Sequence, residues 1–337
     1  MKQYNVAIAG VTGAVGQVFL SILQERDFPV KNLYALASSR SAGKKIMFKS
    51  EEFEVKELNE DSFKNVDIAL FSAGAGRSKQ YAPYAAQSGA VVIDNSSAFR
   101  MEDAVPLVVP EVNPGDIFKH EGIIANPNCS TIIMAVAIKP LYDISRIKRV
   151  VVSTYQAVSG AGAKAIAELE SQTKDIICAG KKDVACSVFP VRIAFNVLPH
   201  IDVFLENGYT KEEMKMNDET KKIFNDSYIK VSATTVRVPV FTSHSEAISI
   251  ETEEKITVDV AKNAISNANG VCLKDDIKKL VYPTPLDSSG KDDVFVGRIR
   301  EDISCENGLC LWAVGDQLRK GAALNAIQIA ELLIKNK

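Results

Sequence analysis

The feature that most constrains the fold is the repeated alternation of short apolar runs with helical patterns over the first 130 residues. YNVAIA, from Tyr4, has the pattern of a buried strand, and GAVGQVFLSILQER follows it with one apolar helical face. LYALA, VDIALFSAG and AVVIDNSSAF indicate further strands, VPLVVPEV and GIIANPN indicate shorter ones, and a helical stretch lies around Tyr81 to Gln87. Strands that alternate with helices form a parallel sheet with helices on both faces. We therefore predict an α/β fold that begins with a Rossmann-like, doubly wound domain.

The pattern changes after about Ile147, where the strand-like runs become longer and alternate between apolar and polar residues. IKRVVVSTYQAVSG, YIKVSATTVRVPVFTSHSEAISIE, DVFVGRIRED and LCLWAVGD are typical of a mostly antiparallel sheet with one packed and one open face. Three helical segments are interposed, and the one that begins with Thr210 and Glu213 fits a capping box. The chain ends on an amphipathic helix, QLRKGAALNAIQIAELLIKNK, which is long enough to pack back on the first domain. We therefore expect one domain from residues 1–127 and 316–337, and a second, α+β domain from residues 128–315.

Composition narrows the class of protein. A chain of 337 residues exceeds what one hydrophobic core usually organises. Forty basic and 42 acidic residues give a net charge of −2, which offers no electrostatic reason to expect nucleic acid or an anionic membrane as partner. The six cysteines include no Cys-x-x-Cys pair, and the sequence shows neither an apolar stretch of about 20 residues nor an export signal. We predict reduced thiols, no metal site and a cytoplasmic location.

Residues 10–16, GVTGAVG, lie between the first predicted strand and helix. Gly10 permits a tight turn, Gly13 lets the backbone approach a pyrophosphate, and Gly16 allows close packing of helix on sheet, with the phosphate at the positive end of the helix. The spacing, G-x-x-G-x-x-G, differs from the common G-x-G-x-x-G fingerprint. An ordinary strand-to-helix turn is the alternative, but the flanking strand and helix favour dinucleotide binding.

The end of the second predicted strand bears on the choice of cofactor. An NAD site usually places an acidic residue there, whereas this chain has Ser38, Ser39, Arg40 and Ser41, followed by two lysines. Hydroxyl groups and a guanidinium suit the 2′-phosphate of NADP, which a carboxylate would repel. We therefore predict NADP as cofactor; the alternative is a solvated basic loop.

The segment NPNCST places Cys129 immediately before an apolar helical run. A thiol at a helix N-terminus has a lowered pKa, and the unpaired N–H groups there can hold an oxyanion. Cysteines are more often buried and inert than catalytic, but this position favours a nucleophile. The other five cysteines lack such a setting and are interpreted as structural.

A cysteine nucleophile usually needs a proton acceptor, and the chain contains only His120, His200 and His244. His120 lies in a charged turn and is expected to be exposed. His200 follows Leu198-Pro199 and could be packed. His244 falls between two strand-like runs, where a loop could present it to a cleft, and position alone favours it only modestly.

Several long motifs along the chain, taken together, are specific to one protein family. They are GVTGAVG, SSRSAGK, DNSSAFR, NPNCST, TYQAVSGAG, EEMKM, RVPVFTSHSE and WAVGDQLRKGAALNAIQIAE. In this order and over essentially the whole chain, they resemble bacterial aspartate-semialdehyde dehydrogenases.

The resemblance implies a reaction. Cys129 would attack the aldehyde, with His244 taking the proton, and hydride loss to NADP would leave a thioester. Phosphate would then release 4-phospho-L-aspartate. In cells the reaction would run in reverse, in lysine, methionine, threonine and diaminopimelate biosynthesis.

The resemblance also implies roles for residues around the substrate and the cofactor. Gln156 would position the substrate, Arg237 would bind its carboxylate and Glu212 its ammonium. The phosphate site would consist of Arg100, Asn128 and Lys215. The cofactor contacts would be Thr12, Gly13, Ala14, Val15, Arg40, Ser41, Ser159, Gly160 and Gln317. Gly10 and Gly16 of the glycine-rich segment and Ser39 of the basic loop would join them.

Each substrate-binding residue has a less specific explanation. Arg237 could face solvent on an alternating strand, and Glu212 and Lys215 could belong to the exposed face of a charged helix. Gln317 could be a polar residue at the start of the last helix.

Two other functions remain open. One is a related phosphorylating reductase such as N-acetylglutamyl-phosphate reductase, whose substrate has no ammonium for Glu212 to neutralise. The other is a catalytically idle dinucleotide-binding protein that acts as a redox sensor or scaffold. Whichever function is correct, the open face of the second sheet predicts a homodimer. The resemblance also implies a homodimer, and two dimers could pair into a tetramer.

Overall fold

The computed structural model describes residues 2–335 of the chain. Two compact units are present: the first comprises Met1–Cys129, Lys222–Phe224 and Gly321–Lys337, and the second comprises Ser130–Lys221 and Asn225–Lys320. The last two residues of the predicted C-terminal helix lie outside the described residues.

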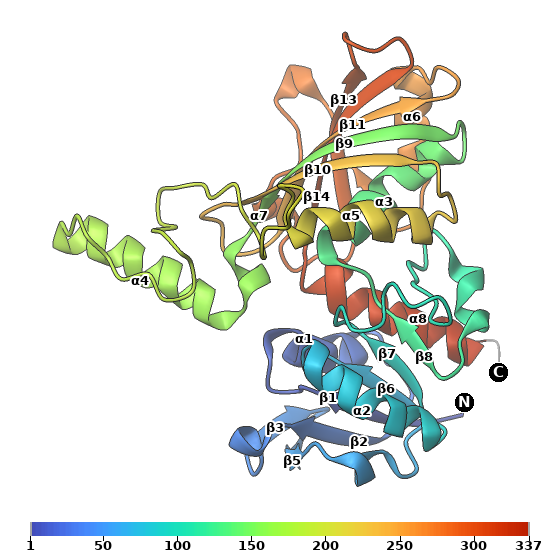
Figure 1. Ribbon diagram of the computed structural model, residues 1–337, viewed down its shortest axis with the longest axis vertical. Helices are drawn as coiled ribbons and strands as arrows, with labels where there is room; N and C mark the ends of the chain where they lie inside the picture. Colours follow the sequence, from blue (N-terminus) through green and yellow to red (C-terminus); the bar gives the residue numbers. More distant parts are fainter. Residues whose placement is uncertain (1, 336–337) are drawn as a thin grey trace. The chain divides into compact units, whose positions relative to one another are not determined.

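The first unit contains the predicted parallel sheet, which confirms the doubly wound α/β fold (Figure 1). All five strand pairings in it are parallel. The order across the sheet is β5 (Lys56–Glu57), β2 (Val30–Ala37), β1 (Tyr4–Ala9), β6 (Ile68–Phe71), β7 (Val91–Asp94) and β8 (Ile123–Ala125).

Helices cover both faces of this sheet because its strands are apolar on both sides. Val6 and Ile8 of β1 belong to one buried cluster with the apolar faces of α1 (Ala14–Glu25) and α8 (Leu324–Lys335). The opposite face includes Phe71 of β6, whose ring stacks on Phe63, and α2 (Ala75–Gln87) contacts β6 and β7. A short hairpin, β3 (Lys45–Phe48) and β4 (Glu51–Glu54), follows β2.

The segment VPLVVPEV does not form the predicted strand. Within it only Leu107 makes an isolated bridge, to Ala125 at the end of β8. The segment contains two prolines, at 106 and 110, which have no N–H to donate to a strand ladder.

The second unit contains a mixed six-stranded sheet, which confirms the predicted second domain with its largely antiparallel centre (Figure 1). The order is β10 (Lys230–Arg237), β9 (Ile147–Gln156), β11 (His244–Thr252), β14 (Gly308–Gly315), β13 (Val294–Glu301) and β12 (Val271–Leu273). The three central pairings are antiparallel, and the two outer pairings, β10 with β9 and β12 with β13, are parallel.

The helices of the second unit are α3 (Cys129–Tyr142), α4 (Ala163–Ala179), α5 (Lys211–Ile223), α6 (Val258–Ser266) and α7 (Pro285–Ser288). The α5 helix begins with the predicted capping box: the Thr210 N–H donates to the Glu213 carboxylate at 2.7 Å, and the Glu213 N–H donates to the Thr210 hydroxyl at 3.3 Å. The side chain of Ile133 on α3 lies against Gly315 of β14, so α3 packs on one face of the sheet.

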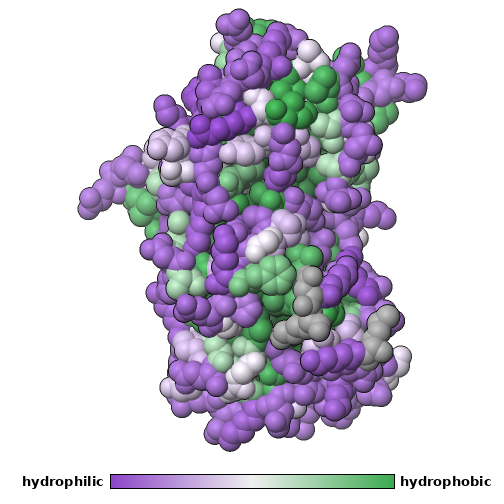
Figure 2. Space-filling model, turned by 90° about the vertical axis from the view of Figure 1, so that its right-hand side faces the viewer, coloured by the Kyte–Doolittle hydropathy of each residue, from purple (hydrophilic) through white to green (hydrophobic). Residues whose placement is uncertain are grey.

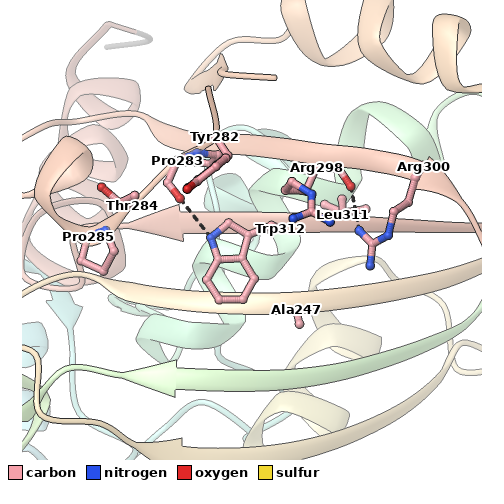
Figure 3. A pocket seen from close by; sticks show the side chains of 9 residues that line it. All are labelled: Ala247, Tyr282, Pro283, Thr284, Pro285, Arg298, Arg300, Leu311 and Trp312. Carbon is pink, nitrogen blue, oxygen red and sulfur yellow. Dashed lines mark hydrogen bonds between the residues drawn. The ribbon is translucent and has the colours of Figure 1, made fainter. Parts of the chain in front are cut away.

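The other face of this sheet is partly open. Val151 and Tyr155 of β9 are each more than one third exposed, and the Tyr155 ring lies 5.4 Å from the ring of Trp312 on β14. Beside Trp312 lies a pocket of about 360 Å³. In Figure 3 the Trp312 side chain points to the loop that follows β12, and its indole N–H donates to the Pro283 carbonyl at 3.1 Å.

Hydrophilic residues predominate on the face of the molecule that Figure 2 shows, as expected for a mean hydropathy near zero. Among residues 2–335, none of the helices has the length and apolar character needed to cross a membrane. No disulfide joins any of the six cysteines in the described part of the chain.

Candidate active site

The glycine loop of the first unit is a backbone cradle, and two of its glycines are required by close contacts. Gly10 has φ +91°, and a Cβ there would lie 2.3 Å from the Ser72 carbonyl oxygen. A Cβ on Gly16 would lie 2.3 Å from the Gly10 carbonyl oxygen, so the first turn of α1 approaches the strand end closely. Gly13 is the N-cap of α1 and is exposed. The glycines therefore let the loop backbone pass close to the N-terminus of α1, whose first N–H groups have no partner within the helix.

A pocket of about 170 Å³ lies at this loop. Three of the predicted cofactor contacts, Gly10, Thr12 and Gly13, line it. Ser38, from the predicted basic loop, also lines the pocket, together with five residues that were not predicted as site residues: Ala37, Leu58, Ser72, Ala73 and Arg77. Ser72 and Ala73 directly follow β6, and ligands of open α/β sheets bind at the carboxyl ends of strands. We had applied this rule to the end of β2 only. Applied to the end of β6 as well, it predicts Ser72 and Ala73 as site residues.

The basic loop after β2 forms a short 3-10 helix, Ser39–Ser41. The Thr12 hydroxyl lies 3.4 Å from the Ser41 hydroxyl, which links this loop to the glycine cradle. The Arg40 side chain is exposed. The loop therefore offers hydroxyl groups and one guanidinium beside the cradle. Ala14 and Val15 lie in the first turn of α1.

Arg100 and Asn128 are buried in the first unit, where Arg100 is held by backbone carbonyls. Its Nε donates to the Asn126 carbonyl at 3.0 Å, and its Nη2 donates to the Asn95 carbonyl at 2.8 Å. Asn126 is itself fixed, because its Oδ1 accepts from Asn325 at 2.7 Å. A guanidinium held in this way keeps a fixed orientation at the carboxyl end of the parallel sheet.

Cys129 is the first residue of α3 and is partly buried. Its neighbour Ser130 is fully buried, and the Ser130 hydroxyl accepts a hydrogen bond from Gln156 Nε2 at 2.9 Å. The start of α3 is thus tied to the last residue of β9. The predicted position of the thiol at a helix N-terminus is confirmed.

Three predicted side chains form one row across the second sheet. Arg237 of β10 pairs with Gln156 of β9, and Ser245 of β11 pairs with Tyr155, so Gln156 lies opposite His244. Residues directly opposite one another project from the same face of a sheet. Arg237, Gln156 and His244 are 6%, 1% and 0% exposed, so the solvent-facing alternative for Arg237 is wrong. We had expected His244 to lie in a loop, but it is the first residue of the strand β11.

Gly160 lies beside two members of this row. A Cβ at Gly160 would lie 2.8 Å from Arg237 Nη1 and 3.2 Å from His244 Nε2. Arg237 Nη1 also donates to the Ala157 carbonyl at 2.7 Å. Ser159 and Gln317 are buried and hydrogen-bonded to each other, and Gln317 Oε1 accepts from the Ser243 N–H at 2.8 Å. The segment from Ala157 to Gly160 therefore packs directly on the row.

A carboxylate and an ammonium group lie next to the row. Lys215 Nζ donates to Glu212 at 3.0 Å and to Asp202 at 2.8 Å. Burial alone would lower the pKa of Lys215, but Glu212 and Asp202 raise it above its usual value. Gln156 Nε2 lies 3.4 Å from Glu212 Oε1. Glu212 is 6% exposed, so the exposed-face alternative is wrong for it, and the Lys215 side chain is only 19% exposed.

The imidazole of His244 has an unusual environment. Its Nδ1 accepts a hydrogen bond from the Ala157 backbone N–H at 3.0 Å, while its buried Nε2 has no partner among the described residues. Burial, and secondly the nearby Arg237 cation, hold the pKa of His244 well below its usual value. Glu246, two residues further along β11, is also fully buried, and neither of its carboxyl oxygens has a hydrogen-bond partner in the described structure.

The other two histidines lie outside this arrangement. His120 Nδ1 accepts from the Gly122 N–H at 2.9 Å, and it is partly buried rather than exposed as expected. The His200 ring stacks on Phe204 at 4.6 Å. The structure therefore brings together Gln156, Arg237, His244, Glu212 and Lys215 with Ser159, Gly160 and Gln317 in the second unit. Gly10, Thr12, Gly13, Ala14, Val15, Gly16, Ser39, Arg40 and Ser41 gather at the glycine loop of the first.

Two family models match the chain. A model described as the semialdehyde dehydrogenase NAD binding domain matches residues 5–120, and one described as the semialdehyde dehydrogenase dimerisation domain matches residues 138–320.

Individual proteins are similar over nearly their full length. An aspartate-semialdehyde dehydrogenase of Aquifex aeolicus is 61% identical over 98% of both chains. A solved structure of aspartate semialdehyde dehydrogenase II from Vibrio cholerae complexed with ASA is 50% identical, covers 99% of both chains and has a TM-score of 0.96. A structure of aspartate semialdehyde dehydrogenase with NADP from Candida albicans is 26% identical, covers 98% of both chains and has a TM-score of 0.77.

Proposed function

Because this chain belongs to the aspartate-semialdehyde dehydrogenase family of oxidoreductases, we propose that it oxidises L-aspartate 4-semialdehyde to 4-phospho-L-aspartate reversibly, with NADP and phosphate. The cell would use the reverse, reductive direction, at the branch toward lysine, methionine, threonine and diaminopimelate. The cytoplasm is the proposed location.

The observation that carries this proposal is the link between the start of α3 and the row of buried side chains. Cys129 adjoins Ser130, which is hydrogen-bonded to Gln156 between Arg237 and His244. Cys129 would act as nucleophile and form a thioester, and Gln156 would hold the substrate beside it. The substrate carboxylate would form a bidentate pair with Arg237, and its ammonium would approach Glu212.

For the phosphate we propose Arg100, Asn128 and Lys215. The Arg100 guanidinium is already oriented by two carbonyls, and Lys215 is a cation kept charged by its acidic neighbours. Two fixed cations and an amide are a suitable set of donors for a dianion.

The cofactor would bind at the glycine loop, and the residues there fit it. Its pyrophosphate would approach Gly10 to Gly16, where the backbone packs so closely that a Cβ at Gly10 or Gly16 would collide with a carbonyl oxygen. Arg40, Ser39 and Ser41 would meet the 2′-phosphate, and Ser159, Gly160 and Gln317 would meet the nicotinamide end. When bound, NADP accepts the hydride from the substrate carbon.

One assay tests the reaction. NADPH formation is followed in a spectrophotometer with L-aspartate 4-semialdehyde, with and without phosphate. We expect turnover that requires phosphate. Faster turnover of an N-acetylated glutamate semialdehyde would assign the chain to the alternative reductase, and no turnover of either would contradict enzymatic activity.

A second assay tests the cofactor. Replacing Arg40→Ala removes a charge-assisted contact and is expected to raise the KM for NADP about 10- to 100-fold while leaving the KM for NAD nearly unchanged. Lys44→Ala, an exposed cation nearby, is the matched control. Equal effects of Arg40→Ala on both cofactors would contradict the 2′-phosphate role.

We also propose a homodimer through the open face of the second sheet. This face carries the exposed Val151 and Tyr155, and the domain that contains it matches the model described as a dimerisation domain. Light scattering at micromolar concentration should give the mass of a dimer, or of a tetramer if dimers pair. Val151→Glu should yield monomers, whereas Ile303→Glu, at a fully exposed turn, should not. A stable wild-type monomer would contradict the proposal.

A further inference from the structure

The α5 helix carries two lysines on one face, and only Lys215 belongs to the proposed phosphate site. Lys222 lies seven residues further along, which is close to two full turns. The two side chains therefore project in almost the same direction, about 10 Å apart along the helix axis. Lys222–Phe224 belong to the first unit, whereas the preceding residues of α5 belong to the second. The last turn of α5 is thus part of the unit that contains Arg100.

The ammonium group of Lys222 is bound to three backbone carbonyls of one turn. Its Nζ donates to the carbonyls of Arg100, Glu102 and Val105 at 2.8, 2.7 and 2.8 Å. An ammonium group has three N–H donors and no acceptor. The three carbonyls occupy all of these donors, so in this arrangement Lys222 has no N–H left with which to bind a phosphate.

The side chains in the turn that Lys222 holds contribute little packing, because residues 101–104 are all exposed. Two backbone hydrogen bonds close the turn. The Glu102 N–H donates to the Phe99 carbonyl at 3.1 Å, and the Val105 N–H donates to the Glu102 carbonyl at 3.0 Å. Hydrogen bonds from a cation are stronger than those between neutral groups. The three bonds from the ammonium group are therefore the stronger restraint on the conformation of this turn.

Arg100 is the first residue of this turn, and it is held at both its side chain and its main chain. Its guanidinium donates to the carbonyls of Asn95, just after β7, and Asn126, just after β8. Its own carbonyl accepts from Lys222. A guanidinium binds an anion through hydrogen bonds that weaken as their angles depart from linear. The orientation of Arg100 toward a phosphate therefore depends on where its main chain is fixed.

We propose that Lys222 is a positioning residue for the phosphate site. Its ammonium group clamps the turn that carries Arg100 to the helix that carries Lys215, and it does not touch the substrate itself. This proposal rests on the proposed function, in which Arg100 and Lys215 bind phosphate. Without the clamp, Arg100 would no longer be held for the phosphate. The attack of Cys129 on the aldehyde would not change, because that step needs neither lysine.

The first test compares Michaelis constants. Lys222→Met keeps much of the length of the side chain but removes the ammonium group. We expect the KM for phosphate to rise about 10- to 100-fold, since small displacements of a binding group have effects of this size, while the KM values for L-aspartate 4-semialdehyde and NADP change less than about twofold. Lys221→Met is the matched control, because Lys221 projects from a different face of α5, and it should leave all three constants unchanged. A wild-type KM for phosphate in Lys222→Met, or an equal rise in all three constants, would overturn the proposal.

A second variant covers the case in which Lys222→Met does not fold. Lys222→Arg keeps the charge, but a planar guanidinium cannot direct three N–H groups at carbonyls that converge on one atom. We expect Lys222→Arg to raise the KM for phosphate by about 3- to 10-fold, again with little change in the other two constants. A wild-type KM for phosphate in this variant would mean that charge alone is sufficient, and it would overturn the proposal.

The last test does not depend on turnover. Hydrogen–deuterium exchange of the full chain, read by mass spectrometry of its peptides, measures how often the backbone of residues 100–105 opens. We expect exchange in this turn to be about 10-fold faster in Lys222→Met than in the wild type, and unchanged in Lys221→Met. Wild-type exchange in Lys222→Met would overturn the clamp. Failure of the proposed function would instead appear as a wild type without phosphate-dependent turnover, whatever the exchange rates, so the two failures are distinguishable.

Discussion

Of the two candidate sites of this chain, one consists mainly of backbone atoms and the other of side chains. In the first unit the glycine loop presents backbone: Gly10 and Gly16 leave no room for a Cβ, and the pocket beside them is lined largely by small residues and main chain. In the second unit the row of Arg237, Gln156 and His244 presents side chains that are almost completely buried. A backbone site tolerates many side chains around it, whereas a buried side-chain site depends on the identity of every member.

This difference leads us to expect opposite responses to mutation. Changes in the second unit should abolish chemistry while leaving the fold and cofactor binding intact. Changes in the glycine loop should weaken cofactor binding and stability together, because the same backbone does both.

The largest effect is expected for Cys129→Ala. Loss of the nucleophile should lower kcat by about 10⁴-fold or more, as for other covalent catalysts, while NADP still binds with nearly unchanged affinity. Steady-state kinetics and a fluorescence titration with NADPH measure the two quantities. Cys178→Ala, at an exposed cysteine on α4, is the control and should retain full activity. Substantial turnover by Cys129→Ala would refute the thioester mechanism.

Arg237→Lys should have the next largest effect. Lysine keeps the charge but cannot form two parallel hydrogen bonds to a carboxylate or reach the Ala157 carbonyl in the same way. We expect kcat/KM to fall by about 100-fold, with most of the loss in KM. Arg149→Lys, an exposed arginine on β9, is the matched control. A variant with wild-type KM would show that Arg237 does not bind the substrate.

Gly10→Ala tests the backbone site. Both Gly10 and Gly43 have positive φ, so alanine at either should cost about 1–2 kcal/mol of unfolding free energy. Only at Gly10 would the new Cβ meet another atom, the Ser72 oxygen at 2.3 Å, whereas nothing lies within 4 Å of a Cβ at Gly43. Gly10→Ala should therefore be the less stable variant and should also lose NADP affinity. If Gly10→Ala and Gly43→Ala lowered the free energy of unfolding in urea and the affinity for NADP by equal amounts, the proposed backbone site would be contradicted.

The smallest effect is expected for Glu246→Gln. Burial raises the pKa of Glu246 well above its usual value, so the folded chain holds a proton that the unfolded chain loses above its ordinary pKa. The contribution of Glu246 to stability is therefore complete below the unfolded pKa and declines as the pH rises toward the folded pKa. Glutamine does not ionise, so the variant should gain about 2–4 °C in Tm over the wild type at pH 8 and little at pH 4.5. Scanning calorimetry at pH 4.5 and pH 8 measures the Tm of both proteins. A wild type with a higher Tm than Glu246→Gln at pH 8 would contradict the prediction.

Local patterns were sufficient for much of the fold. The strand, glycine turn and helix from Tyr4 to Glu25 follow one another as predicted, and so does the capping box at Thr210. Where prediction failed, a non-local or conformational factor was decisive. The segment VPLVVPEV is apolar enough for a strand, but its prolines limit pairing to one bridge at Leu107. His244 was expected in a loop, yet it is the first residue of β11 and pairs with Gly315 of β14, a residue more than 70 positions away in the chain.

The sequence by itself determined the parallel α/β unit, the glycine cradle at residues 10–16 and the position of Cys129 at a helix start. Each of these depends on residues that are close together in the chain, where spacing fixes geometry. Only the tertiary structure decided that Arg237, Gln156 and His244 form a row, that Glu212 is buried beside it, and that the Ala157 backbone N–H donates to the His244 ring. Ala157 and His244 are 87 positions apart in the chain, and contacts at such a separation exist only because strand register brings the same faces together.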